Sequence, residues 1–223
     1  AIARGCAGAV LLLGRSSPRI ERLAGLAAQR GLAVKRLSMD DLDRHAGRDE
    51  HRGLVLLAPE QPRGATSLRE AVQGAGEHSL LVLLDGVTDP RNLGAILRSA
   101  DMFSADAVVT PHRRSAHETQ AVRTTSAGAV EWVPVISVAN LTQAIAALKE
   151  AGYWVYGAEA GGDDPARVDL RGRVALVLGA EGSGLRRLVR ESCDRLIGIP
   201  TSGHVDSLNV AAAAAILMYE ARR

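Results

Sequence analysis

Residues 80–98 read LLVLLDGVTDPRNLGAILR and change character twice. The apolar run 80–84 predicts a short buried strand, and the glycine, aspartate and proline residues after it are typical of a turn. Apolar residues then return and indicate a helix. A strand, a polar loop and a helix in this order form the repeating unit of an α/β fold.

Two later stretches repeat the order of an apolar strand, a loop rich in glycine and polar residues, and a helix. They are 177–185, VLGAEGSGL, and 199–210, IPTSGHVDSLNV. Ligands of open parallel sheets bind beyond the carboxyl ends of the strands, where such loops converge. The sequence therefore predicts a site assembled from three loops on one rim of a sheet.

Apolar runs recur along the chain and are separated by amphipathic stretches of helical period. Strands are expected at 9–13, 34–37, 54–58, 80–84, 107–110, 132–135, 154–158, 174–178 and 196–199. Ser17 and Pro18 predict the start of a helix that Gly31 ends, and Asn140 predicts the cap of another that ends at Gly152. This alternation predicts an α/β protein with a mostly parallel sheet.

The pattern is weakest from Pro59 to Gly76, where proline and glycine cluster and 67–73 suits a short helix. We therefore place a boundary near residue 75. It separates a small N-terminal α/β unit, residues 1–75 with their linker, from residues 76–223, a segment of ordinary domain size.

The N-terminal part of the chain is modestly basic. Residues 1–76 hold 12 Lys and Arg against 8 Asp and Glu, whereas the remainder holds 15 against 17. The surplus suits a polyanionic partner, and an ordinary solvated surface explains it equally well. Since Phe103 is the first aromatic residue, residues 1–76 cannot stack nucleic-acid bases on rings. Nucleic acid bound there would be held through phosphates, hydrogen bonds and shape.

Composition excludes several classes of protein. The chain is 47% hydrophobic and 23% charged, which argues against disorder. Cys6 and Cys193 are too few for a disulfide framework, and no apolar run approaches the ~18 residues of a membrane-spanning helix. The six histidines lack metal-ligand spacing, so we expect no metal. Without a signal-peptide pattern, the sequence predicts a cytoplasmic protein.

The glycine-rich loop around Glu181 matches no common nucleotide motif. It is neither a Walker A loop nor a G-x-G-x-x-G fingerprint, and Ser183 does not stand in a G-x-S-x-G nucleophile elbow. The arginine clusters 113–114 and 186–190 suit either phosphate contacts or solvated helix faces.

Polar residues of the first loop have two interpretations. Asn92 reads as a helix cap, and Gly94 and Arg98 share one helix face. That face suits an approaching phosphate or ribose, or is simply the solvated side of a surface helix.

The polar residues of the other two loops are equally ambiguous. Glu181 and Ser207 are each either a helix cap or a ligand contact, whereas Asn209, expected inside the helix, needs another explanation. Residues 210–219 are apolar almost all round, which predicts a buried helix.

Taken together, the order and spacing of the three loops resemble the SpoU (TrmH-like) branch of the SPOUT RNA methyltransferases. That family's Asn-x-Gly followed by Arg matches Asn92, Gly94 and Arg98. Its Gly-x-Glu-x-x-Gly-Leu motif matches 179–185, and its Ile-Pro, Gly and Ser-Leu-Asn-Val motif matches 199–210. The resemblance covers roughly residue 80 to the C-terminus. Residues 1–60 are similar to the ribosomal-protein-like substrate-binding domain of bacterial 23S rRNA guanosine 2′-O-methyltransferases.

The resemblance implies transfer of a methyl group from S-adenosylmethionine to a ribose 2′-hydroxyl, by a protein with a deep trefoil knot in its C-terminal unit. It implies RNA as the partner, with rRNA favoured by the N-terminal domain, and a homodimer formed through residues 207–221. The catalytic residues that it implies are Arg98, Asn92, Glu181, Ser207 and Asn209. The cofactor-binding residues that it implies are Leu178, Gly179, Ile199, Leu208 and Asn209, with Thr125, Ser126 and Ala127 from a segment similar to one that lines the cofactor in the family.

Arg98 is the family's candidate for activating the hydroxyl, yet a guanidinium with a pKa above ~12 is a poor base. We therefore expect Arg98 to stabilise the developing alkoxide or to anchor its phosphate. Methylation of tRNA, a non-catalytic RNA-binding relative and a generic nucleotide-dependent α/β enzyme are the competing interpretations. The missing nucleotide motifs argue against the last of these.

Overall fold

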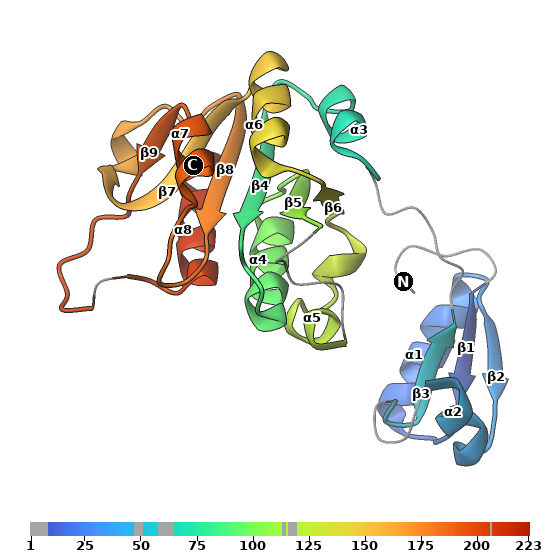
Figure 1. The fold of residues 1–223 in the computed structure, drawn as a ribbon. Helices are drawn as coiled ribbons and strands as arrows, with labels where there is room; N and C mark the ends of the chain where they lie inside the picture. The colour runs from blue at the N-terminus through green and yellow to red at the C-terminus, as the bar shows by residue number, and fades with distance from the viewer. Residues whose placement is uncertain (1–8, 47–50, 58–64, 113–114, 116–119, 206) are drawn as a thin grey trace. The chain divides into compact units, whose positions relative to one another are not determined.

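The computed structural model describes residues 9–46, 51–57, 65–112, 115, 120–205 and 207–223. It divides into two compact units, Ala1–Gln61 and Pro62–Arg223 (Figure 1). The division falls before the expected position near residue 75 because α3 (Leu68–Gln73) packs on the C-terminal unit. Its Ala71 is buried in that unit's core, and Arg173 donates to the carbonyls of Ala75 and Gly76.

The N-terminal unit is a small α/β layer. Its strands are β1 (Val10–Leu13), β2 (Ala33–Arg36) and β3 (Leu54–Leu57), in the order β2-β1-β3 with β2 parallel and β3 antiparallel to β1. Helices α1 (Pro18–Gln29) and α2 (Met39–Ala46) complete it. Leu11 and Leu13 share a core with Ile20, Ala24 and Ala27 of α1.

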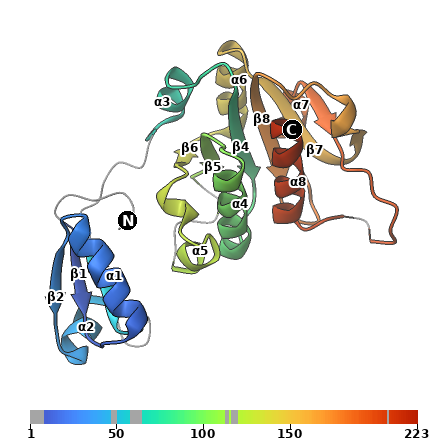
Figure 2. The same ribbon diagram turned by 180° about the vertical axis from the view of Figure 1, so that it is seen from behind.

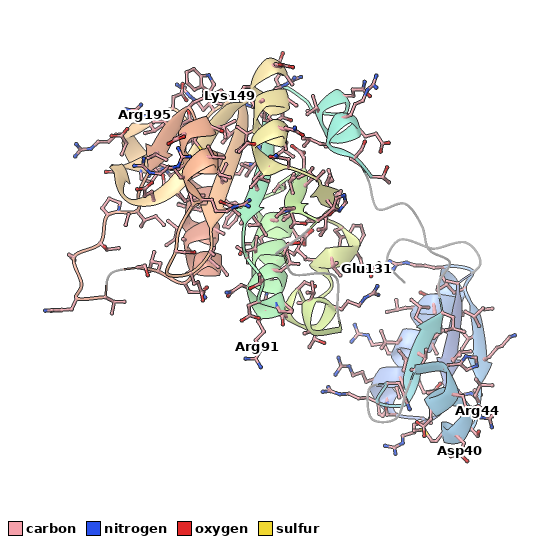
Figure 3. All side chains as sticks on the ribbon, viewed as in Figure 1. Asp40, Arg44, Arg91, Glu131, Lys149 and Arg195 are labelled. Carbon is pink, nitrogen blue, oxygen red and sulfur yellow. The ribbon has the colours of Figure 1, made fainter. Side chains whose placement is uncertain are left out.

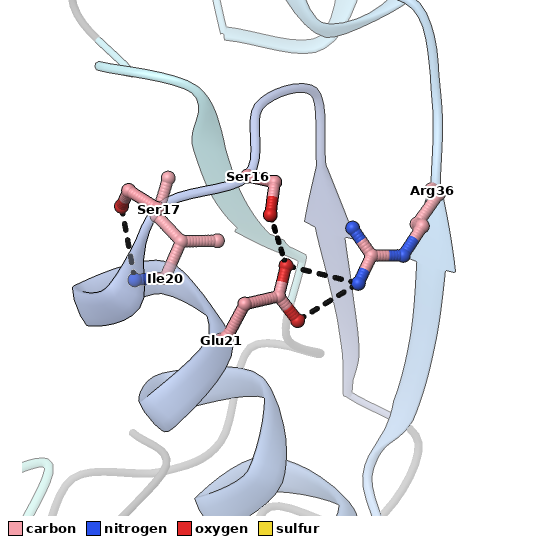
Figure 4. Close-up of polar contacts among 5 residues, drawn as sticks. All are labelled: Ser16, Ser17, Ile20, Glu21 and Arg36. Atoms are coloured by element: carbon pink, nitrogen blue, oxygen red, sulfur yellow. Dashed lines mark hydrogen bonds and ion pairs between the residues drawn. The ribbon is translucent and has the colours of Figure 1, made fainter.

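The predicted start of α1 is confirmed. Ser17 accepts a hydrogen bond from the backbone N–H of Ile20 at 3.3 Å, directly before Pro18 (Figure 4). Glu21, also in the first turn, accepts from Ser16 at 2.8 Å and from Arg36 of β2 at 2.8 and 3.0 Å. These hydrogen bonds, that from Ser16 first, lower the pKa of Glu21. The first turn of α1 is thereby attached to the edge strand.

The C-terminal unit contains a six-stranded parallel sheet in the order β6-β5-β4-β8-β7-β9, which confirms the predicted class. Its strands are β4 (Ser79–Asp85), β5 (Ala107–Pro111), β6 (Val135–Val138), β7 (Trp154–Asp163), β8 (Arg173–Gly179) and β9 (Arg195–Ile197). Its helices are α3, α4 (Pro90–Met102), α5 (Gln120–Thr125), α6 (Leu141–Glu150), α7 (Arg187–Ser192) and α8 (Val210–Arg222), with the short 3-10 helices η2 (Ala129–Glu131) and η3 (Pro165–Arg167).

Alternate residues of β4 enter two separate cores, one on each face of the sheet. Leu80, Val82 and Leu84 pack with α4, α5 and α8, and Leu81 and Leu83 pack with α3, α6 and α7. Figure 2 shows α4 and α8 side by side. Burial on both faces is what a parallel sheet requires, and it explains the continuous apolar run of β4. The loops after β4, β8 and β9 meet where the strands have their carboxyl ends (the carboxyl edge of the sheet).

Two expectations are corrected. The strand expected at 132–135 occupies Val135–Val138, because η2 takes up the preceding residues and Pro134, which has no N–H, only accepts a hydrogen bond from Val108. The last helix is buried on one side only: Ala214 and Leu217 are covered, whereas Ile216 and Tyr219 are 38% and 52% exposed.

The predicted trefoil knot is consistent with this topology and stays a prediction. Within the described ranges, no helix is long and apolar enough to cross a membrane.

Candidate active site

Three side chains from the three predicted loops form one hydrogen-bonded cluster. Asn92 lies on α4, Glu181 in the loop after β8, and Asn209 at the start of α8. Asn209 Nδ2 donates to Glu181 Oε1 at 2.5 Å and to Asn92 Oδ1 at 3.0 Å, and Asn92 Nδ2 donates to Glu181 Oε1 at 3.0 Å. Residues up to 117 positions apart therefore meet, as the convergence of the loops predicts.

The cluster is not closed to other ligands. Glu181 and Asn209 are exposed, and Glu181 Oε2 accepts no hydrogen bond from any residue that the structure describes. A carboxylate oxygen accepts from several donors, so this one is available to a substrate hydroxyl or amine.

The caps of the two helices differ from those expected. Asp89 caps α4 by accepting from the N–H of Arg91 at 2.8 Å, with Pro90 in the first turn, so Asn92 lies inside the helix. Asn209 caps α8 through Oδ1, which accepts from the N–H groups of Ala211 and Ala212. The expectation that Asn209 lies inside the helix is therefore wrong, and of the two interpretations of Ser207 the cap of this helix is excluded, because Asn209 occupies that position.

An asparagine cap explains why Asn209 serves both the helix and the cluster. Its oxygen satisfies the helix N–H groups while its amide nitrogen donates to Glu181 and Asn92. A serine or an aspartate at the same position has no second group with two donors. The local cap and the distant contact therefore use opposite ends of one amide.

A cavity of about 640 Å³ adjoins Glu181, which belongs to its lining. The other predicted residues that line it are Leu178, Gly179, Ile199, Ser207 and Leu208. Its volume falls within the ~300–1,000 Å³ of small-molecule sites, and apolar side chains and glycine backbone make up much of its wall.

Gly179 is required by a close approach of two backbone segments. A Cβ added there would lie 2.1 Å from the carbonyl carbon of Gly184. The loop turns back over Gly179, and Ala180 and Gly184 exchange two backbone hydrogen bonds at 2.9 and 3.2 Å. Only glycine allows this crossing at the wall of the cavity.

Other residues of the wall were missed by the sequence analysis. Glu159 of β7 and Arg190 of α7 form an ion pair at 2.5 Å beside the cavity, and Ala213 and Leu217 of α8 complete its wall. Since β7 is the neighbour of β8, the end of the strand expected at 154–158 was the available signal, because residues 158–160 line the cavity.

Thr125, Ser126 and Ala127 lie outside this lining. Thr125 ends α5, and Ser126 and Ala127 follow it. This helix packs on α4 so closely that a Cβ on Gly94 would be 2.7 Å from Cβ of Thr125. The space at Gly94 is therefore filled by Thr125 and not left open to a phosphate or ribose.

Arg98 also lies outside the lining of the cavity. It is exposed on α4, and its side chain makes no hydrogen bond or ion pair within the described part of the chain. It lies six positions after Asn92, which corresponds to about 9 Å along a helix. Within one chain, Arg98 is therefore not one of the residues that line the cavity, although the sequence analysis expected it beside the cofactor.

The predicted arginine clusters have different outcomes. Arg186 pairs with Asp85 at 2.6 Å and Arg187 with Glu191 at 2.9 Å, so neither is an unpaired phosphate ligand. Arg113 and Arg114 lie outside the described residues.

Burial decides the state of the described cysteine. It raises the pKa of Cys193 to about 11, so its thiol stays protonated at neutral pH. Cys6 is outside the described residues. In the described ranges, no three His, Cys, Asp or Glu side chains gather as a metal site would require.

Residues 79–219 match the SpoU rRNA Methylase family, whose span includes all three loops and the cavity. The chain belongs to this family. It is 42% identical to the 23S rRNA (guanosine-2′-O-)-methyltransferase RlmB of Xanthomonas campestris pv. campestris, over 94% of this chain and 85% of the relative.

Solved structures of the family have the same fold. The AdoMet-bound rRNA methyltransferase of Sinorhizobium meliloti has a TM-score of 0.73 at 26% identity, over 96% of this chain and 78% of that one. The TrmH/SpoU tRNA modifying enzyme of A. aeolicus has a TM-score of 0.59 at 28% identity, over 70% of this chain and 79% of that one.

Proposed function

We propose that this SpoU protein transfers the methyl group of S-adenosylmethionine to the ribose 2′-hydroxyl of a guanosine in 23S rRNA. The observation that carries the proposal is the Asn92–Glu181–Asn209 cluster, which reaches the 640 Å³ cavity through Glu181, whereas Asn92 and the predicted cofactor ligand Asn209 are not among the residues that line it. The rRNA activity named for the Xanthomonas relative, which matches 94% of the chain, supports the substrate. Ribosomal RNA as substrate also points to the cytoplasm.

The cavity suits S-adenosylmethionine, which supplies an activated methyl group. Leu178, Ile199 and Leu208 offer apolar surface for the adenosine, and Gly179 lets the ligand approach the backbone. Thr125, Ser126 and Ala127 would act from a distance by packing against α4, which carries Asn92. Holding two reactants in a near-attack geometry supplies ~7–11 kcal/mol of the barrier, so positioning is the main task of these residues.

The cluster would orient the reacting nucleotide. Glu181 Oε2 is open to a ribose or base donor, Asn92 and Asn209 fix the carboxylate through Oε1, and Ser207 adds a hydroxyl to the same wall. Arg98 would stabilise the alkoxide that develops on the 2′-oxygen, while the proton leaves through a neighbour or water.

Arg98 is exposed and lies outside the lining of the cavity. Its guanidinium would therefore act in the site of a second copy of the chain. Exposed apolar side chains on α4 and α8 support such a homodimer: Met102 is 74%, Tyr219 52% and Ile216 38% exposed. Arg91, two turns before Arg98 on α4, also points away from the ribbon (Figure 3) and adds a second cation without a side-chain partner among the described residues.

A lysine at position 98 tests the geometric role, because it keeps the charge and loses the planar fork. We expect Arg98→Lys to lower kcat at least tenfold with an unchanged dissociation constant for S-adenosylmethionine. Near-normal methylation by this variant would contradict the role. Mapping 2′-O-methyl groups in total RNA with and without the gene then separates rRNA from tRNA, and absence of both would favour a non-catalytic relative.

The N-terminal unit would bind the RNA backbone. Arg15, Arg19, Arg22 and Arg52 are exposed, and their side chains make no hydrogen bond or ion pair within the described residues. They form two neighbouring pairs: Arg19 and Arg22 are three positions apart on α1, and Arg15 lies beside the segment of Arg52, because a Cβ on Gly53 would be 3.0 Å from Cβ of Arg15. Unpaired guanidinium groups suit phosphates, which agrees with the absence of aromatic residues.

Replacing these four arginines by glutamine is expected to raise KM for 23S rRNA at least tenfold and to weaken its salt dependence. Affinity for S-adenosylmethionine should stay unchanged. The matched control is the double variant Arg36→Gln and Arg44→Gln, whose guanidinium groups already pair with Glu21 and Asp41. Equal effects of the two sets would contradict a specific RNA surface.

A further inference from the structure

A buried carboxylate lies behind the cavity and does not touch it. Asp85 ends β4, and its side chain is fully buried. Its Oδ2 accepts from the backbone N–H of Arg186 at 2.8 Å, and its Oδ1 accepts from Arg186 Nε at 2.6 Å. Asp85 is absent from the lining of the cavity. Its hydrogen bonds therefore act on the protein and not on a ligand.

Asp85 is adjacent to both ends of the loop 179–186. In the parallel register, Asp85 is the partner of Gly179, where the loop leaves β8. Arg186, which Asp85 holds, is the residue with which the loop enters α7. Residues 179–185 between these points all line the cavity.

The internal contacts of the loop do not fix its exit. Its tip is closed by the two hydrogen bonds between Ala180 and Gly184, and Gly182 and Gly184 have positive φ. After Gly184 the backbone is attached to the sheet through Arg186 and Asp85. A shift of Arg186 would move Leu185 and Gly184, and with them the crossing over Gly179 and the position of Glu181.

The two partners differ in how they tolerate separation. Arg186 is half exposed and can be hydrated, whereas the carboxylate of Asp85 has no access to water. A buried charge without its donors is strongly disfavoured, so Asp85 keeps the loop closed.

We propose that Asp85 is a positioning residue for the cofactor cavity: it fixes the exit of loop 179–186 through Arg186 and thereby sets the wall that binds S-adenosylmethionine. The inference rests on the proposed function, and it adds a residue that acts through another and touches no ligand.

The test measures the dissociation constant of S-adenosylmethionine for the full chain by calorimetric titration, with kcat and KM for 23S rRNA. Asp85→Asn is expected to raise that constant at least tenfold and to leave KM for RNA within threefold. The matched control is Asp194→Asn. Asp194 likewise accepts from one backbone N–H, that of Val155, and pairs with one cation, Lys149. It lies at the amino ends of the strands, away from the cavity.

If Asp85→Asn does not fold, the pair Arg186→Ala and Arg186→Lys replaces it. The alanine variant is expected to bind S-adenosylmethionine at least tenfold more weakly, and the lysine variant to recover to within threefold of the parent. Normal binding by Asp85→Asn or Arg186→Ala, or equal weakening by Asp194→Asn, would overturn the positioning role. Failure of the parent chain to bind S-adenosylmethionine would overturn the proposed function first, and this inference with it.

Discussion

The amino ends of the parallel strands (the amino edge) and their carboxyl ends (the carboxyl edge) each carry a cluster of polar side chains. The two clusters differ in whether a hydrogen-bond acceptor is left without a partner. At the amino edge, Ser79 contacts Asp106 and Tyr153, both at 2.6 Å, and Asp106 also accepts from the N–H of Leu80. At the carboxyl edge, Asn92, Glu181 and Asn209 bind one another, and an oxygen of Glu181 remains free of any described partner.

Burial follows the same division. Ser79 and Tyr153 are 1% and 3% exposed, whereas Glu181 is exposed. Charged groups differ too: Lys149, at the upper edge in Figure 3, pairs with Asp194, while Arg91 at the lower edge has no side-chain partner among the described residues. A polar cluster whose groups are all satisfied holds the fold, and one with open acceptors and cations can bind a ligand.

The largest effect should come from Gly179, where the carboxyl edge has no room for a side chain. In Gly179→Ala, the new Cβ meets Gly184 backbone at 2.1 Å, so the loop must move. We expect binding of S-adenosylmethionine to weaken by roughly 100-fold or more in a calorimetric titration, a loss of the size that misplacements near 1 Å cause in catalytic rate. Gly76→Ala is the control, because a Cβ there has nothing within 4 Å. Normal binding by Gly179→Ala would show that the loop does not form the cofactor wall.

A smaller effect separates orientation from charge within the carboxyl-edge cluster. Glu181→Ala removes the acceptor shared by Asn92 and Asn209, and we expect kcat to fall about 100-fold. Glu181→Gln can keep one acceptor, so a loss of about tenfold is expected. Because Glu181 is exposed, Tm should change little. Both are read from steady-state methylation of 23S rRNA and a thermal melt.

Glu191→Ala is the control for this pair, because Glu191 is an exposed carboxylate whose one ion-pair partner among the described residues is Arg187 on α7. It should leave kcat unchanged. A Glu181→Ala variant with full kcat and a lowered Tm would show that the carboxyl-edge cluster stabilises the fold, as the amino-edge cluster does, and takes no part in catalysis.

The sequence could predict what depends on neighbours within a few positions. Ser17 and Asn140 cap the helices expected of them, and the strand–loop–helix order places three loops on one rim. The step from there to a cavity that includes Gly179 and Leu208 needed the resemblance to a family as well as the order of elements.

Contacts across the chain could not be predicted in the same way. Asp85 and Arg186 are 101 positions apart, and nothing local distinguishes Arg186 from its neighbour Arg187, which pairs within its own helix. Asn92 was mistaken for a cap because Asp89 offers the same chemistry three residues earlier. Tertiary packing decides which of two chemically similar residues makes the contact, and the periodicity of the sequence carries no information about that packing.

The amino edge should respond in stability and not in activity. Tyr153→Phe removes the hydroxyl that contacts Ser79, a buried hydrogen bond whose loss costs about 1 kcal/mol. For a chain of this size we expect Tm to fall by about 2–4 °C, with kcat and KM for RNA unchanged. A change in kcat at constant Tm would place this edge in the active site.

The smallest effect concerns the same phenol at alkaline pH. Burial raises the pKa of Tyr153 above its usual value of 10.0, so the folded protein keeps a proton that the unfolded chain loses as pH rises past 10. The unfolded state then binds fewer protons, and the free energy of unfolding must fall with increasing pH. Comparing urea midpoints at pH 8 and pH 10.5 (roughly half a unit above the unfolded value) should show a smaller loss in Tyr153→Phe than in the parent. Part of the loss remains in the variant because burial also raises the pKa of Tyr156. Identical losses in the two proteins would mean that the phenol of Tyr153 ionises as freely in the fold as in the unfolded chain, and the amino edge would then be open to water as the carboxyl edge is.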